Sequence, residues 1–465
     1  MSERESSGPK LQRILSSPEV LLLTISALSP TVSVFVGGNA VLHLAGSGAA
    51  IAFLLGGIFS ASFGLLYAEI GAAFPGAGGM YPSIVKLLGA RWAFPYVVMT
   101  APLVFPTLAF SALGFADYVR TLIPSLPILA ITFTSLFAAA TISVLNIKRS
   151  AHLTSVFLAI EIAGLAVVTV LAATHVRQSL FEVLTHPQML VPAHVASKSG
   201  VQPSSVLAMA LATVSGIWAS AGANWALFFA EDMQDVQQRI GRVTAWAGAI
   251  AALTISVPMI LIVMAIDDYP AMLSAEAPIA ALVGHLGGPV VGTLISIGVA
   301  TAIFNALIAT FMGNSRFLYA SGRDGIWPRP INRVLAFVHP RYHSTLGASG
   351  AMLVIGGLCA LLSERSLLIL ISGNLIDYVL ISAAVIVGRR RALTGHYFKA
   401  PLHPLVPLFG MFVMIASVIA DWLDADAGRP SMILLGSVFV AALVYFEFRL
   451  RQTGQPIVMS GTGDN

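Results

Sequence analysis

Long apolar runs separated by short polar gaps dominate the chain. A membrane-spanning helix needs ~20 mostly apolar residues, whereas a strand of a membrane barrel shows ~10 alternating ones. By this measure about twelve runs are long enough to span a bilayer. They are roughly 19–44, 48–72, 94–118, 125–146, 152–173, 205–230, 243–266, 290–315, 345–363, 366–388, 403–422 and 430–449. The pattern predicts an all-α polytopic membrane protein with about twelve transmembrane helices.

The first apolar run is interrupted near its middle by Ser29, Pro30, Thr31 and Ser33. Proline removes a backbone donor, and its ring clashes with the preceding turn. Inside a bilayer, the freed backbone groups must find partners within the protein. The interruption therefore indicates either a kinked helix whose hydroxyls bond to their own carbonyls or a break that lines a binding cavity.

A second interruption of small residues, 219–224, lies in the sixth run. Interrupted segments at matching positions of two halves indicate the binding site of a transporter. Because each half has an odd number of spans, the second half is expected to be inserted upside down. We therefore expect a tail (1–18), spans 1–5 (19–173), an outer loop (174–204), spans 6–10 (205–388), two accessory helices (389–449) and a second tail (450–465).

The two breaks together suit a zwitterion. The N-terminal end of a half-helix favours a carboxylate, and the carbonyl end of another favours an ammonium group. The backbone around Thr31 is expected to hold the carboxylate, and the carbonyls after Trp218 the amino group. The alternative is two packing kinks. The candidate substrate-binding residues are Ser29, Thr31, Val32, Ser33, Trp218, Ala219, Gly222 and Asn224.

Two of these candidates have distinct side-chain chemistry. Trp218 offers an apolar surface and a cation–π face that could close over a bound molecule, or it packs within the bundle. Asn224 could bond the substrate or tie the broken backbone. Both interpretations stay open for each residue.

Glu161 is the carboxylate nearest the centre of the first five spans. An ionisable residue at this depth is costly and indicates function, so Glu161 is a candidate proton-coupling group. Alternatively, it is a neutral acid bonded to a neighbouring helix, or it faces water without titrating. Asp377, with Asn374 in the tenth span, is a weaker candidate and is interpreted as a tie between helices.

Thr301 and Asn305 lie four residues apart in the eighth span and so share one helix face. Their oxygens make a candidate alkali-cation site. Side chains of this kind also bond between helices, and that interpretation remains open.

Composition and charge agree with this picture. The chain has 465 residues, 57% hydrophobic and only 10% charged, whereas a soluble domain has about 25% charged residues. With the N-terminus inside, the outer side keeps only Arg120, Arg177, Lys198, Arg365 and Arg429 of the 25 Lys and Arg. The positive-inside rule predicts this asymmetry, with both termini cytoplasmic. The basic residues thus follow topology, and the net charge of +4 does not indicate a nucleic-acid partner.

Signals for catalysis, metals and cofactors are absent from the sequence. There is no HExxH, Walker loop or CxxC, and 46–48 lacks the third glycine of a dinucleotide fingerprint. The single cysteine, Cys359, excludes an internal disulfide framework. An enzyme is therefore disfavoured, and neither a cofactor nor a metal is expected.

Four stretches resemble the amino acid–polyamine–organocation permease family. They contain an acidic, proline and double-glycine pattern after the second span, an acidic loop after the sixth, a basic motif after the eighth and a proline-rich entry to the eleventh. In this sequence they are YAEIGAAFPGAGGMY (67–81), FAEDMQDVQQRI (229–240), SRFLYASGRDGIWP (315–328) and YFKAPLHPLVP (397–407).

The resemblance implies a LeuT-type 5+5 inverted-repeat fold with broken helices 1 and 6, two accessory helices and rocking-bundle alternating access. The family's first-span glycine pattern falls on 31–35, where Ser33 replaces a glycine. Trp218 falls on the substrate-covering tryptophan of arginine/agmatine exchangers, which carry Glu where this chain has Asn224. Several relatives carry a lysine where this chain has Glu161.

We therefore expect a multi-pass permease of the cytoplasmic membrane that imports an amino acid or related amine with a proton. Alternatives are an amino-acid exchanger, a sodium symporter using Asn305 and, from another class, a nutrient receptor that binds without net transport. The centres of the first and sixth runs hold no carboxylate, which favours neutral substrates. The sequence does not indicate an oligomeric state.

Overall fold

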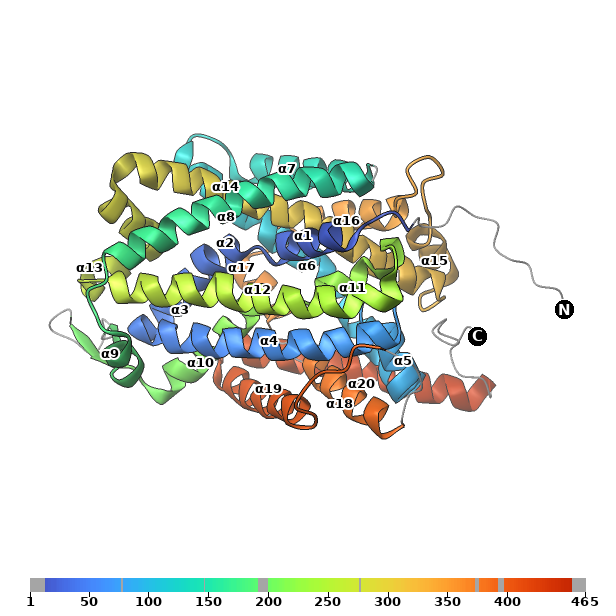
Figure 1. The fold of residues 1–465 in the computed structure, drawn as a ribbon. Coiled ribbons are helices and arrows are strands. Elements are labelled where there is room, and N and C mark those ends of the chain that lie inside the picture. Colours follow the sequence, from blue (N-terminus) through green and yellow to red (C-terminus); the bar gives the residue numbers. More distant parts are fainter. Residues whose placement is uncertain are drawn as a thin grey trace.

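The computed structural model describes residues 13–76, 78–145, 147–190, 200–275, 277–372, 376–391 and 397–453. Within these ranges the chain is a bundle of helices with a single small hairpin (Figure 1). The first part forms α1 (Ser17–Leu28), α2 (Pro30–Val32), the π-helical turn η1 (Ser33–Gly37), α3 (Gly38–Ala45), the 3-10 turn η2 (Gly46–Gly48), α4 (Ala49–Ala73), α5 (Tyr81–Leu88), α6 (Ala90–Leu122), α7 (Ile128–Val144) and α8 (Ile147–Thr174).

The connection to the second part contains α9 (Leu180–Thr185) and the hairpin strands β1 (Gln188–Leu190) and β2 (Val201–Pro203). The segment predicted as an outer loop thus carries local structure. The second part forms α10 (Val206–Ser220), α11 (Trp225–Phe228), η3 (Ala230–Asp232), α12 (Val236–Ala265), α13 (Tyr269–Leu273), α14 (Pro278–Arg323, kinked at Gly288), α15 (Arg329–Leu335), α16 (Leu346–Cys359), α17 (Glu364–Ile371), α18 (Ile376–Arg390), α19 (Leu405–Leu423) and α20 (Gly428–Thr453).

Among the described residues, nine helical segments are long and apolar enough to cross a membrane, and two shorter apolar helices, α7 and α16, accompany them. The first segment, Ser17–Ala73, is 57 residues long. At 1.5 Å per residue it is about 85 Å long, more than twice the ~30 Å of a hydrocarbon core. It changes direction at Gly46, whose φ is 57°. The protein is therefore a helical, multi-pass membrane protein.

Close contact between α4 and α12 forms the centre of the bundle, where the two helices lie side by side (Figure 1). A Cβ on Gly64 would lie 2.9 Å from the Cα of Gly248, so only glycine permits this approach. Ser256 Oγ also donates to the Phe53 carbonyl at 2.6 Å. Small residues and hydroxyl bonds are the usual means by which helices pack in membranes, where no hydrophobic force joins them.

The core consists mainly of two hydrophobic clusters, one towards each end of the bundle. Their boundary crosses five helices, α1, α4, α10, α12 and α14, each within a few residues. Leu23 belongs to one cluster and Leu28 to the other, and the same change occurs between Ile303 and Leu307 on α14. The buried polar residues of the candidate site lie at this boundary.

Candidate functional site

The first helix breaks at one residue, Ser29. Its φ of 48° and ψ of 88° are left-handed, and its N–H closes α1 by donating to the Ile25 carbonyl at 2.8 Å. Pro30 then starts α2, where its fixed φ suits the first helical position and its missing N–H costs no bond. The Ser33 N–H donates back to the Ser29 carbonyl at 3.0 Å, so the helix resumes at once. The break is thus short, and Thr31 lies in the first turn after it.

Glu161, on α8, bonds to this break. Its Oε1 accepts hydrogen bonds from Ser29 Oγ at 2.7 Å and from the Thr31 N–H at 3.0 Å. Thr31 Oγ1 in turn donates to the Glu161 carbonyl at 3.4 Å. The Glu161 side chain is only 1% exposed. A carboxylate of the chain itself therefore uses a backbone donor that was expected to hold a substrate carboxylate.

Asn305, on α14, lies beside Glu161 and is fully buried. Among the described residues, Glu161 Oε2 and both amide atoms of Asn305 have no geometrically acceptable hydrogen-bond partner. Buried polar atoms are nearly always hydrogen-bonded, so these unpaired atoms could accept or donate a hydrogen bond to a further polar group. Thr301 does not join it, because its Oγ1 donates to the Ile297 carbonyl of its own helix at 2.8 Å. A hydroxyl that donates its proton still has lone pairs for a cation, so the cation site of Thr301 and Asn305 stays a prediction.

The second helix breaks between Ser220, which ends α10, and Trp225, which starts α11. Ala221 is extended, and Gly222 has a φ of 155°. Asn224 precedes α11 but makes no side-chain cap bond. The Trp225 N–H donates to the Gly222 carbonyl at 3.1 Å, which restarts the helical path.

The two breaks are in contact. A Cβ on Gly222 would lie 3.0 Å from the Leu28 Cβ, directly before Ser29. A Cβ on Gly37 would lie 2.9 Å from the Ala219 Cβ. Two segments almost two hundred residues apart in sequence are thus packed together through glycines.

Trp218 occupies the last turn of α10 and is 46% exposed, so it is not a core packing residue. Trp225 behaves differently, because its ring lies against Gly313 and 5.3 Å from the Phe228 ring. The tryptophan before the second break therefore has a free surface, and the one after it is partly buried against Gly313 and Phe228.

Charged groups tie the bundle together near the starts of α1 and α12 and the end of α14. Arg389 donates to Glu69 at 2.5 and 2.9 Å, and the Ala400 N–H donates to the same carboxylate at 2.8 Å. Asp232 and Arg316 form an ion pair in which both side chains are at least 96% buried.

Tyr81 extends this network by donating to Asp324. Burial, together with the nearby Asp324 carboxylate, raises the pKa of Tyr81 well above its usual value, so the hydroxyl stays a donor. Arg323 pairs with Glu231 at 3.1 Å. All four family-like stretches contribute to these ion pairs and hydrogen bonds, which sequence reasoning missed although the charges in the motifs were a signal for them.

Asn374 lies outside the described residues, so its expected pairing with Asp377 is not described. Among the described residues, Asp377 Oδ1 has no hydrogen-bond partner. The described part of the chain contains no group of three or more His, Cys, Asp or Glu residues that could hold a metal ion.

Comparison with known proteins agrees with this architecture. A family model described as amino acid permease matches residues 15–448. The chain belongs to the amino acid permease family. This is a family of transporters and not of enzymes, so the protein is a membrane permease for amino acids.

Curated relatives match over most of the chain. The branched-chain amino acid permease BcaP of Lactococcus lactis subsp. cremoris (strain MG1363) is 22% identical over 95% of this chain and 95% of the relative. BcaP of Bacillus subtilis (strain 168) is 24% identical over 88% and 89%. The human Asc-type amino acid transporter 1 is 23% identical over 85% and 76%.

Proposed function

We propose that this permease is a secondary active transporter that imports amino acids across the cytoplasmic membrane by alternating access, together with a proton. The observation that carries the proposal is the bonding of Glu161 to Ser29 Oγ and the Thr31 N–H at the first break. An intramembrane carboxylate that accepts a hydrogen bond from the first turn of a helix can bind a proton, and it competes with an anionic substrate group for the same N–H.

Glu161 couples proton binding to substrate binding, because its carboxylate competes with the substrate carboxylate for the Thr31 N–H. As a carboxylate it keeps Thr31 N–H occupied, and a substrate carboxylate at the same helix start would face a second buried negative charge. Like charges that share a buried site cannot both stay ionised at low cost. A proton on Glu161 removes this repulsion and weakens its acceptor strength, which frees the Thr31 N–H. A proton entering with the membrane potential supplies about 2.3 kcal/mol per 100 mV.

The second break provides the rest of the site. Carbonyl groups at the end of α10, from Ala219 to Gly222, attract the substrate ammonium. Trp218 closes over the side chain, and Asn224 adds a polar contact at the start of α11. Val32 and Ser33 form the wall after the first break.

A neutral side chain is the substrate class we propose. The sequence between Val20 and Ala45, and between Val206 and Phe229, contains no Asp or Glu. A basic substrate would therefore find no counter-ion on the two broken helices themselves, and the carboxylate beside them, Glu161, is already bonded to Ser29 and Thr31. The names of the relatives, a branched-chain permease and an Asc-type transporter, support the same class.

The proposed architecture is the twelve-span, 5+5 inverted repeat. Ser17–Ala73 is long enough for two spans, and α7 and α16 supply two more beside the eight other long segments. The repeats are 19–173 and 205–388, the loop 174–204 is outside, and 389–449 holds two accessory helices. Both tails, 1–18 and 450–465, are cytoplasmic. This fits the positions of the start of α1 and the end of α20, which lie at the same end of the molecule (Figure 1).

Uptake into liposomes tests the proposal. Purified protein should accumulate radiolabelled leucine, alanine or serine when the outside is acidic and sodium is absent. Uptake that requires sodium would transfer the coupling role to that ion, with Asn305 as a ligand. Uptake that requires an internal amino acid would make the protein an exchanger. Saturable binding without any flux would contradict transport and favour a receptor.

A further inference from the structure

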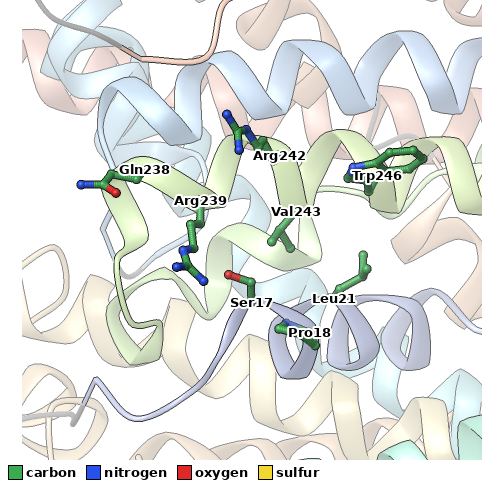
Figure 2. A pocket seen from close by; sticks show the side chains of 8 residues that line it. All are labelled: Ser17, Pro18, Leu21, Gln238, Arg239, Arg242, Val243 and Trp246. Atoms are coloured by element: carbon green, nitrogen blue, oxygen red, sulfur yellow. The ribbon is translucent and has the colours of Figure 1, made fainter.

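A cavity of about 590 Å³ opens between the first turns of α1 and α12, and its lining belongs to neither break (Figure 2). Two backbone bonds hold the chain segments that enter these helices together. The Leu15 N–H donates to the Asp232 carbonyl, and the Gln234 N–H donates to the Leu15 carbonyl, both at 2.8 Å. The cavity therefore lies between two helices that begin at the same level.

The lining changes from polar to apolar along both helices (Figure 2). On α12, Arg239 and Arg242 precede Val243 and Trp246, and these spacings of three, four and seven residues define one helix face. On α1, Ser17 precedes Leu21 in the same way. Arg239 and Trp246 lie about 10 Å apart along the axis. Because both helices begin candidate spans, we expect the lining to run from the headgroup level into the hydrocarbon.

The polar half of the cavity favours an anion. The Arg239 side chain is 57% exposed, and the one ion pair that it forms with a described residue, Asp235 at 3.7 Å, is a weak surface pair. Arginine binds phosphate strongly because its planar guanidinium can donate two parallel hydrogen bonds. The Ser17 Oγ atom is buried and has no hydrogen-bond partner among the described residues, so the cation character of this half comes from Arg239 and Arg242.

The apolar half favours a lipid chain over water. Trp246 is 63% exposed, and Leu21 is partly exposed beside the buried Val243. Exposed tryptophans are typical of the interface between lipid and water. A small soluble anion would contact the arginines alone and would leave this wall uncovered.

We propose that the cavity binds an anionic phospholipid. Its phosphate lies between Arg239 and Arg242 beside the first turn of α1, and the upper part of one acyl chain lies along Leu21, Val243 and Trp246. The lipid bridges α1 and α12. Since α1 ends at the Ser29 break, a lipid bound here restrains the helix that must move during alternating access.

Native mass spectrometry of the full chain tests the proposal. Protein released from nanodiscs that contain equal phosphatidylglycerol and phosphatidylcholine should retain phosphatidylglycerol preferentially. The double variant Arg239→Gln/Arg242→Gln should lose this preference at least about fivefold, as expected for the loss of basic residues near a membrane surface. The matched control Arg329→Gln/Arg333→Gln removes two exposed arginines of α15 and should retain it.

A second variant distinguishes the contribution of the acyl chain to binding from that of the phosphate. Trp246→Ala should reduce phosphatidylglycerol retention, and excess glycerol 3-phosphate should not displace the lipid from the wild type. Equal retention of both lipids by the wild type would overturn the proposal, as would equal losses in the double variant and its control. Displacement by glycerol 3-phosphate would instead identify a site for a soluble anion. Unchanged thermal unfolding verifies that each variant is folded.

Discussion

The carboxylate of Glu161 is bonded unevenly. Oε1 accepts from Ser29 Oγ and from the Thr31 N–H, whereas Oε2 is buried without a partner among the described residues. A carboxylate that only tied helices together would use both oxygens, because an unbonded buried oxygen costs about 1–3 kcal/mol. The uneven bonding fits a group that exchanges a proton or a partner during its work.

Replacement of this residue tests the proton role. Glu161→Gln keeps the size of the side chain but is always neutral, so it imitates the protonated acid. We expect substrate binding to persist and uptake in proteoliposomes to lose its dependence on pH between about 5.5 and 7.5, where the wild type should be stimulated by acid. Glu182→Gln, on the exposed helix α9, is the control. An unchanged pH profile in the Glu161 variant would refute the proton role.

Trp218 allows a second test at this scale. If its exposed ring covers the substrate, Trp218→Ala should raise the KM for uptake about tenfold, because aromatic contacts with a bound group contribute about 1–2 kcal/mol. The control is Trp92→Ala, whose ring on α6 is similarly exposed at 41%. Saturation curves that overlay the wild type would leave Trp218 without a role in binding.

At the scale of elements, the contact of the two broken helices depends on glycine. A methyl group at Gly222 would meet the Leu28 side chain at 2.7 to 3.0 Å. Gly222→Ala should therefore lower the free energy of unfolding by about 1–3 kcal/mol and reduce uptake. Gly114→Ala is the matched control, since a Cβ there meets nothing within 4 Å. Equal unfolding temperatures of the Gly222→Ala and Gly114→Ala variants would show that the close contact between the two broken helices is not needed for stability.

The buried pair of Asp232 and Arg316 joins the start of α12 to α14. Arg316→Gln leaves Asp232 with an unpaired charge in the core, which should cost about 3–5 kcal/mol of stability. The double variant Asp232→Asn/Arg316→Gln removes both charges and should recover most of this loss. Thermal unfolding of the single and double variants measures the difference. An additive loss in the double variant would mean that the two residues act independently.

The whole molecule combines a polar layer with one tightly bonded end. Ser29, Glu161 and Asn305 are buried where the two hydrophobic clusters meet, and the ion pairs of Asp232 and Glu69 lie towards one end of the bundle. The first break is closed to water here, since Ser29, Thr31 and Glu161 are each at most 4% exposed. In the alternating-access cycle proposed above this bonded end has to open, so its ion pairs are expected to limit the rate of opening.

Local sequence signals anticipated the helical membrane class and the positions of both breaks, because proline, serine and glycine act on their own backbone. They did not indicate that Glu161 would bond to Thr31, since that contact joins residues 130 positions apart. The cation site of Thr301 and Asn305 stays a prediction, because the spacing of two residues on a helix does not reveal whether a hydroxyl bonds to its own carbonyl. The pairing of Arg389 with Glu69 likewise depends on how distant helices pack.

The orientation of the chain gives a prediction for the molecule as a whole. Because Cys359 is the single cysteine, Cys359→Ser provides a background for site-directed labelling. Ser179→Cys, in the proposed outer loop before α9, should react with a membrane-impermeant maleimide on intact cells. Gln452→Cys, an exposed position at the end of α20, should react only after the membrane is opened. These outcomes follow from the excess of Lys and Arg in the loops assigned to the cytoplasm. Labelling of Gln452→Cys in intact cells would reverse the orientation and with it the proposed direction of proton entry.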